Sequence, residues 1–392
     1  MFPHNKFNLV CKFFCLAPIS SNIHTQRFLY TYSLITIFCL ILATAFSFSI
    51  NVFGEGYIVS SLATSVVFLS GIIGHITTVL ESLLKRKEHE SFFGRLQELE
   101  DIFRLKLQHR IQVGFYRKKL LWKYSILSIL IVVSLTAYIY IISVRDYQGY
   151  FWSASLSVIV ARIRFIQVSI YVDLISFQFD SMNLLLKQIT KSRIQHKNRI
   201  LEEDYDLIDN TERIFVLKLI YTKLNDLVIC LNEAFGWSIL TLTVYFSLDL
   251  TCNIYWLFLT WEALLVSYSA YESYTTIFPI GLLLFLLSYT CSMCSNKSDV
   301  SKTLVHQMLV DSTLDQTNYL LDAFLLQIYN QPIGFHAKRF FYINLKLLTS
   351  VSFNCIDSYL VLCSYLNNPQ ISASMLGYLV ILIQFQLTEN EL

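Results

Sequence analysis

Residues 28–50 read FLYTYSLITIFCLILATAFSFSI, an apolar run without a charged side chain. The run is long enough to cross a bilayer as a helix, which takes roughly 20 residues. Lys6, Lys12 and Arg27 precede it, and no small-residue cleavage site follows it. We therefore predict that this stretch is an uncleaved membrane anchor rather than a signal peptide.

Similar apolar runs recur along the chain, which is 55% hydrophobic and only 15% charged. A soluble domain carries about a quarter charged residues, so an integral membrane protein is indicated. Helices are expected because backbone groups in lipid must be bonded within the segment, and the runs lack the alternation of barrel strands. We predict an all-α polytopic membrane protein with seven transmembrane helices. The predicted spans cover residues 28–50, 57–80, 124–144, 151–174, 237–259, 274–294 and 371–387.

Basic residues are distributed unevenly between the connections. The segments after the second and fourth spans are rich in Lys and Arg, whereas the short loops after the first, third and fifth spans hold only Arg145. Basic loops stay in the cytosol, so we predict the N-terminus inside and, after seven spans, the C-terminus outside. G-protein-coupled receptors have the opposite orientation.

The predicted cytosolic segments have helical patterns. Between Leu304 and Ile328, apolar residues follow near-helical spacing with aspartates between them, and the pattern ends before Pro332. Residues 92–121 and 184–231 are similarly mixed. These segments are too polar to span, so we predict helices that pack together as a cytosolic anchor.

Polar residues inside predicted spans are candidates for function, because they are costly in lipid. Arg164, Gln167 and Tyr171 follow i, i+3 and i+7 spacing and share one helix face. They are candidates for a ligand pocket, as are His75 and Asp249. In the alternative interpretation, the arginines and the acids only hold the bundle together, and the two interpretations remain open. The acids available for such pairing are Asp173, Asp249 and Glu262.

Signatures of enzymes are missing from the sequence. It contains no GxSxG, HExxH, P-loop or GxGxxG motif, and its eight histidines lack metal-ligand spacing. Cys291 and Cys294 form a single CxxC at the end of an apolar span, where a structural role is favoured over a metal or redox site. We therefore predict no enzyme activity, catalytic residue, metal or cofactor. The sequence has no basic face with stacking aromatics, so we predict no nucleic-acid partner.

The end of the chain carries a distinctive pattern. Residues 377–385 read GYLVILIQF, which resembles the signature of the insect gustatory receptors: Thr-Tyr, five hydrophobic residues and Gln-Phe, with Gly377 in place of threonine. Residues 231–237, LNEAFGW, and the stretch from Arg164 to Leu174 are also similar to that family.

The resemblance implies a ligand-gated, non-selective cation channel in the plasma membrane of chemosensory neurons. Four identical or related subunits would surround one pore in the lipid bilayer, and each would bind a small-molecule tastant in the outer half of its own bundle. The last spans would line the pore. A transporter or a metabotropic seven-span receptor is the alternative function, and the sequence does not disclose the ligand. The resemblance assigns pore or gate positions to Tyr378, Leu382, Gln384 and Phe385.

A segment before the signature departs from the family pattern. Joining Ser350 directly to Ile371 restores the family spacing to Tyr378, and Val351-Ser352 and Gln370 can be encoded by the two ends of an intron. We interpret 351–370 as an insertion or a retained intron. The predicted divisions are a cytosolic N-terminus (1–27), a six-span bundle with the ligand pocket and long cytosolic loops (28–294), a cytosolic amphipathic anchor helix (295–346), this segment (351–370) and the pore-lining last span (371–388).

The orientation can be tested with epitope tags. A tag at position 1 should be cytosolic and a tag within residues 51–56 should be outside, because the basic connections anchor the chain on the cytosolic side. Antibody staining of intact and permeabilised cells separates the two positions. Staining of the N-terminal tag in intact cells would contradict the orientation.

Overall fold

The computed structural model describes residues 4–16, 23–49, 58–107, 113–144, 150–196, 203–261, 270–310, 315–347 and 349. The segment 351–370, the span 371–388 and the residues Tyr378, Leu382, Gln384 and Phe385 lie outside the described residues. The elements are α1 (His4–Phe13), α2 (Ile23–Ser49), α3 (Ile58–Leu84), α4 (Arg86–Lys106), α5 (Val113–Val144), α6 (Tyr150–His196), α7 (Glu203–Trp261), α8 (Ala270–Val310), α9 (Asp315–Asn330), β1 (His336–Ala337) and β2 (Phe341–Tyr342).

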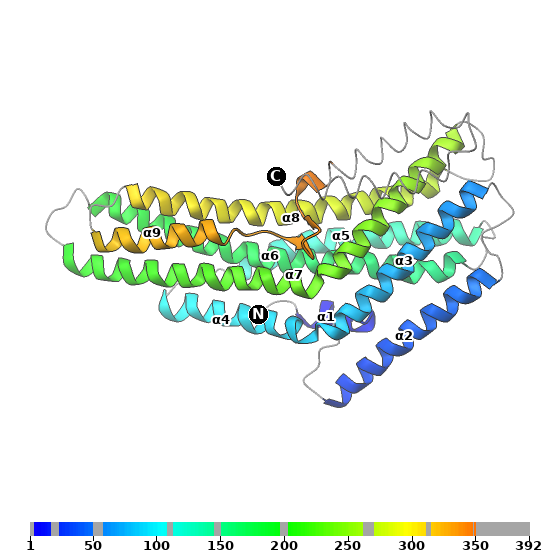
Figure 1. Ribbon diagram of the computed structural model, residues 1–392, viewed down its shortest axis with the longest axis horizontal. Helices are drawn as coiled ribbons and strands as arrows, with labels where there is room; N and C mark the ends of the chain where they lie inside the picture. The colour runs from blue at the N-terminus through cyan, green and yellow to red at the C-terminus, as the bar shows by residue number, and fades with distance from the viewer. Residues whose placement is uncertain are drawn as a thin grey trace.

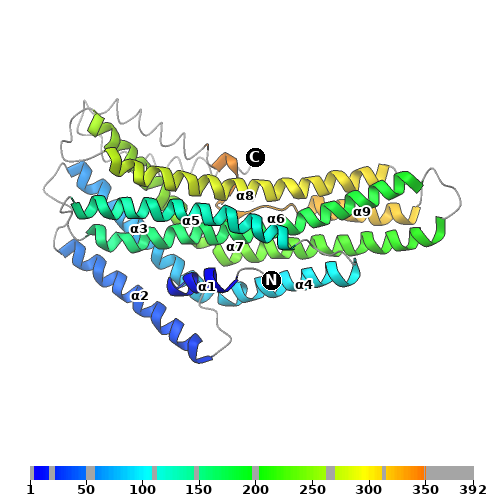
Figure 2. The same cartoon turned by 180° about the vertical axis from the view of Figure 1, so that it is seen from behind.

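Three long helices form the frame of the molecule. The helices α6, α7 and α8 contain 47, 59 and 41 residues, and α6 lies against both of the others (Figure 1 and Figure 2). At 1.5 Å per residue, such helices measure roughly 60–90 Å, at least twice the hydrocarbon thickness of a bilayer. A large part of this frame must therefore extend beyond the membrane.

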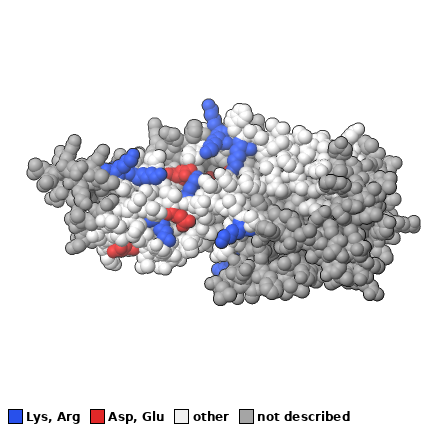
Figure 3. All heavy atoms as spheres, turned by 90° about the horizontal axis from the view of Figure 1, so that it is seen from above, with Lys and Arg blue, Asp and Glu red and all other residues white. Residues whose placement is uncertain are grey.

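Charged side chains gather at one end of the frame. On the face shown in Figure 3, they lie over the left half and the middle, toward the end where Figure 1 shows α9, while the described surface farther right is uncharged. We call the end that contains α4 and α9 the polar half. The other end, which contains α2, α5 and most of α3, is the apolar half.

Among the residues that the structure describes, four helices are long and apolar enough to cross a membrane. In the most apolar 18-residue stretch of α2 only 11% of the residues are buried, and in that of α5 only 17%. Phe38 and Ile41 of α2 and Ile129 and Val132 of α5 are exposed. Exposed apolar side chains of this kind are suited to a surface that contacts lipid. Half of the residues in the most apolar 18-residue stretch are buried in α3 and in α8, so these helices pack inside the bundle. The four segments are His24–Ser49, Thr64–Leu84, Lys118–Ile141 and Ser273–Val310.

The predicted fourth and fifth spans lie within α6 and α7, which are not among those four helices. The charged residues Arg162 and Arg164 lie within the predicted fourth span and Asp249 within the fifth. They are buried side chains at contacts between helices, as described below. The count of seven spans and the orientation stay predictions.

The polar half contains the predicted cytosolic helices. One face of α4 is buried, including Phe92, Leu96, Leu99 and Phe103, whose spacing of three or four residues is that of an amphipathic helix packed on a partner. This helix lies against α7. The structure divides the amphipathic segment 304–328 between the end of α8 and α9.

The structure contains a pair of short strands that the all-helical prediction did not include. In β1 and β2, His336 pairs with Tyr342 and Ala337 pairs with Phe341 in antiparallel register. The pair follows Pro332, where the helical pattern ends. Two-residue strands are too short to produce the alternating pattern by which strands are recognised in a sequence.

A buried ion pair joins α3 to α6. Arg164 Nη2 lies 3.4 Å from Glu81 Oε2, and the two side chains are 0% and 3% exposed. Arg164 Nε also donates to Ser238 Oγ of α7 at 3.0 Å. The guanidinium therefore contacts two helices besides its own, inside a core of otherwise apolar side chains.

Replacing Arg164 by methionine should destabilise the protein strongly, because Glu81 then remains buried without its cationic partner. Loss of one partner of a buried pair costs roughly 3–5 kcal/mol, and loss of an exposed pair costs about 0–1 kcal/mol. We expect Arg164→Met to lower the apparent melting temperature of the purified protein in detergent. The control Arg86→Met removes the more exposed Arg86–Glu90 pair of α4 and should change it little.

The double variant Glu81→Gln with Arg164→Met should recover part of the lost stability, because it leaves no unpaired charge. Equal melting temperatures for Arg164→Met and Arg86→Met would show that the buried pair does not hold the bundle together.

Candidate functional site

The structure brings Arg164, Gln167 and Tyr171 together on one face of α6, as their spacing predicts. Arg164 Nη1 donates to Gln167 Oε1 at 2.9 Å. Arg164 and Gln167 also donate to the carbonyl oxygen of Leu16 at 3.4 Å and 3.5 Å. The turn that follows α1 therefore contacts both side chains. All three residues are buried.

Tyr171 contributes a ring to an aromatic cluster. The ring stacks on Phe92 of α4 with centroids 5.0 Å apart, and its edge-to-face contact with Phe235 of α7 spans 5.3 Å. Such pairs add to the stability that burial alone supplies. The helices α4, α6 and α7 meet at this cluster.

A short part of α7, residues 232–238, receives contacts from several elements, and we call it the α7 joint. The backbone amides of Trp237 and Ser238 donate to the two carboxylate oxygens of Glu81 at 2.8 Å and 2.9 Å. A side chain that bonds to amides within a helix is a common cause of bending, and α7 changes direction along its length (Figure 1). Glu81 therefore holds both Arg164 and the backbone of α7.

Phe235 occupies the centre of the α7 joint. The guanidinium of Arg164 lies 4.3 Å from its ring centroid, and the ring of His89 meets it edge-on at 4.5 Å. Burial, with a smaller effect from the charge of Arg164, lowers the pKa of His89 well below its usual range. The imidazole is therefore neutral at neutral pH and acts here as an aromatic packing group.

A second group of buried polar residues, the Asp249 cluster, lies in the apolar half and consists of Ser134, Arg162, Tyr245, Asp249 and Asn253. Asn253 Nδ2 donates to Asp249 Oδ1 at 2.7 Å, and Arg162 Nη1 donates to Ser134 Oγ at 2.7 Å. Arg162 and Tyr245 also interact electrostatically with Asp249. Arg162 Nε is buried without a hydrogen-bond partner. This cluster combines an acid, a cation and an unused donor, which are groups that can orient a polar ligand.

His75 and Asp173 join helices elsewhere in the bundle. His75 Nδ1 lies 3.1 Å from Ser157 Oγ, which links α3 to α6. Asp173 Oδ2 accepts hydrogen bonds from Lys123 and Tyr124 of α5, both at 2.6 Å. Asp173 is thus bonded to α5, and the acid that pairs with Arg164 is Glu81.

Glu81, Tyr245 and Asn253 are not among the residues that the sequence predicts for the site. Glu81 follows the second predicted span directly, where an acid has no periodic pattern to mark it. Tyr245 and Asn253 lie four residues on either side of Asp249 along α7, so the i, i+4 spacing about a buried acid was the available signal. Glu262, another predicted partner for the arginines, lies outside the described residues.

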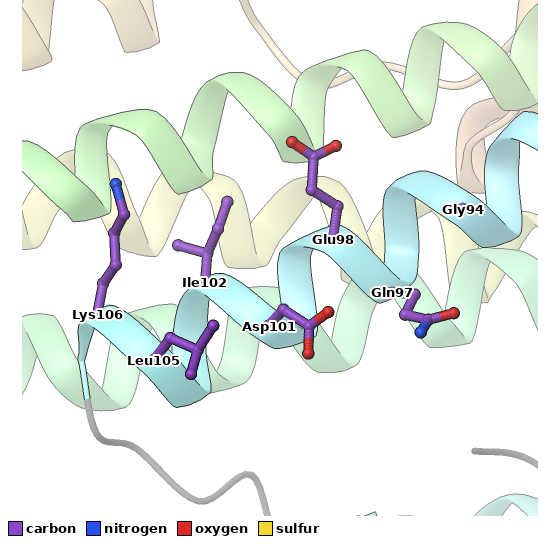
Figure 4. A pocket seen from close by; sticks show the side chains of 7 residues that line it. All are labelled: Gly94, Gln97, Glu98, Asp101, Ile102, Leu105 and Lys106. Carbon is purple, nitrogen blue, oxygen red and sulfur yellow. The ribbon is translucent and has the colours of Figure 1, made fainter.

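A shallow groove runs along α4 in the polar half (Figure 4). The side chains that line it come from this one helix, and one of them, Glu98, lies 3.0 Å from Lys223 of α7. It contains none of the residues that the sequence marked for function, so we do not assign a ligand to it. Its lining residues are Gly94, Gln97, Glu98, Asp101, Ile102, Leu105 and Lys106.

Comparison with solved structures shows a shared fold. The insect olfactory receptor OR5 from Machilis hrabei superposes with a TM-score of 0.65 at 14% sequence identity, over 91% of this chain and 96% of that chain. The same receptor in complex with eugenol superposes with a TM-score of 0.60 at 15% identity, over 92% and 97% of the two chains.

Comparison of sequences identifies relatives over most of the chain. A Drosophila melanogaster protein designated gustatory receptor 39b is 24% identical over 323 residues, which cover 80% of this chain and 85% of the relative. Another, designated gustatory receptor 2a, is 23% identical over 375 residues, covering 85% and 80%. The family model described as 7tm Chemosensory receptor matches residues 8–363. The chain therefore belongs to the 7tm chemosensory receptor family.

Proposed function

We propose that this protein is a gustatory receptor subunit that acts as a ligand-gated, non-selective cation channel opened by a small-molecule tastant. Family membership and the similarity to gustatory receptors support the class of stimulus. The proposed location is the plasma membrane of chemosensory neurons, where the four apolar helices cross the bilayer with the remaining spans.

The observation that carries the proposal is the Asp249 cluster, buried in the apolar half of a bundle of this family. A buried arginine nitrogen without a partner is costly, so such a site favours a polar ligand or a bound water. The fold is shared with an olfactory receptor solved in complex with eugenol, a small molecule. We therefore propose that Asp249 and its neighbours contact the ligand.

The ligand roles predicted for His75, Arg164, Gln167 and Tyr171 stay predictions. Their hydrogen bonds and ring contacts support the alternative role, in which they hold α1, α3, α4, α6 and α7 together. The two roles differ in what a substitution changes. A ligand contact affects the concentration dependence of the response, whereas a packing contact affects the amount of folded receptor.

We propose that the last span, 371–388, lines the pore. Four such spans would surround the pore of a homotetramer or heterotetramer, with Tyr378, Leu382, Gln384 and Phe385 facing the gate. An apolar constriction closes a pore by excluding water, and side-chain amides such as that of Gln384 would admit it. The insertion or retained-intron origin of 351–370 is also a proposal, and the family match ends inside this segment, at residue 363.

Cells that express the chain alone should show a ligand-evoked cation current without an added G protein. Phe385→Ser should raise the resting current, because a wetter constriction costs less free energy to open. The matched control is Phe38→Ser on the lipid-facing surface of α2, which should leave the resting current unchanged. Whole-cell recording with surface labelling measures both.

The same recording separates the alternatives. A response that requires an added G protein would favour the metabotropic receptor. Ligand uptake without a channel-like conductance would favour the transporter. An unchanged resting current in Phe385→Ser, at normal surface abundance, would remove Phe385 from the gate.

Asp249→Asn should raise the half-maximal ligand concentration by about tenfold or more at unchanged surface abundance, because loss of one charged hydrogen bond costs roughly 1.5–3 kcal/mol. Gln167→Ala is the comparison from the Arg164 network. A shift in concentration dependence for Gln167→Ala would support its ligand role, and lower abundance would support packing. An unshifted response in Asp249→Asn would contradict the proposed site.

A further inference from the structure

The strand pair β1–β2 is fastened to the α7 joint by a side-chain amide. Asn232 Nδ2 donates to the carbonyl of Gly334 at 2.9 Å, and Asn232 Oδ1 accepts a hydrogen bond from the amide of His336 at 3.2 Å. Asn232 is 4% exposed, and Ala337 of β1 is completely buried. One buried amide therefore holds two backbone groups of the strand-pair segment.

Lys338, between the two strands, makes a second attachment. Its Nζ lies 2.7 Å from Glu233 Oε2 and donates to the carbonyl of Glu233 at 3.4 Å. The hydrogen bond from Lys338 lowers the pKa of Glu233, so this carboxylate is ionised at cytosolic pH. An ion pair of this kind links the strand pair to the α7 joint at physiological pH.

Close approach at Gly236 strengthens this attachment. A Cβ atom at Gly236 would lie 2.9 Å from Lys338 Cγ, so the aliphatic stem of the lysine occupies the space where α7 has no side chain. Lys338 has a φ of 48°, a left-handed conformation that is uncommon for residues other than glycine. The chain thus turns sharply at the point where it contacts α7.

The α7 joint also contacts α3 and α6. Glu81 bonds to the amides of Trp237 and Ser238, and Arg164 lies over Phe235. Within seven residues of α7, some side chains and amides therefore contact the helices of the bundle, and others contact the strand pair, the last described element before the proposed pore span.

We propose that the α7 joint and the strand pair move as one rigid unit, which transmits rearrangement of the bundle to the chain that enters the pore span. The inference rests on the proposed channel function. It assigns positioning roles to Asn232, Glu233, Gly236 and Lys338, none of which lies in the Asp249 cluster or in the proposed gate. The ion pair of Glu233 with Lys338 couples ligand binding to opening.

Charge reversal tests the ion pair. Lys338→Glu and Glu233→Lys should each reduce the maximal ligand-evoked current several-fold at equal surface abundance, with a smaller change in half-maximal concentration. The combined variant Glu233→Lys, Lys338→Glu should restore most of the current. The control Arg104→Glu breaks an exposed pair with Asp101 on α4 and should leave the current intact. Normal maximal currents in both single variants would overturn the inference.

A reversible crosslink tests whether the unit is rigid. The contact between Gly236 and Lys338 brings the two positions within range of a disulfide, so Gly236→Cys with Lys338→Cys can be joined by a mild oxidant. We expect a weak response in the reduced double variant and a larger response after oxidation. Each single-cysteine variant with oxidant controls for the native thiols. A channel that loses its response on oxidation would show that the two parts must separate, and the inference would be wrong.

A measurement without current separates this inference from the channel proposal. In purified protein, Lys338→Glu should speed amide hydrogen exchange in residues 334–342 and leave exchange in α2 unchanged. Absence of current in the wild-type protein, together with this local increase, would reject the channel and keep the attachment. A conducting wild type with unchanged exchange in Lys338→Glu would reject the attachment and keep the channel.

Discussion

The carboxylate of Glu81 is the group on which the arrangement of the helices depends. Glu81 lies at a contact between α3 and α7, and these helices approach so closely that a Cβ at Gly74 would fall 2.9 Å from Leu242 Cδ2. One oxygen pairs with Arg164 of α6, and both oxygens accept backbone amides of α7. A buried carboxylate is tolerated when its lone pairs are used in this way. Three helices, whose contacting residues lie 74 or more positions apart in the chain, are thereby held together.

The bundle separates two kinds of buried polar group. Around the α7 joint, the polar atoms bond mainly to other helices or to backbone, and aromatic rings fill the space between them. In the Asp249 cluster, Asp249 bonds to Asn253 one turn farther along α7, Arg162 bonds to Ser134 of α5, and one arginine nitrogen has no hydrogen-bond partner. The first arrangement favours a fixed geometry. The second leaves an arginine N–H donor without a partner, and a ligand or a water molecule can accept its hydrogen bond.

Several features were predictable from the sequence because each depends on a local pattern. Hydropathy located α2, α3, α5 and α8, and helical spacing put Arg164, Gln167 and Tyr171 on one face. The partner of Arg164 was not predictable, because pairing depends on which acid the tertiary fold brings near, and Glu81 is 83 residues away along the chain. The strand pair was not predicted either, because a strand of two residues is too short to produce a detectable sequence pattern.

The two buried arginines of α6 have a consequence for biosynthesis. A charged residue near the centre of a helix costs about 2.5–3.5 kcal/mol during insertion into the membrane, so the α6 segment is a poor substrate for insertion on its own. Glu81 precedes Arg164 in the chain and is synthesised first, whereas Asp249 follows later. In the predicted topology, stable integration of α6 therefore relies on α3 remaining nearby, and a substitution in one helix is expected to prevent another from entering the bilayer.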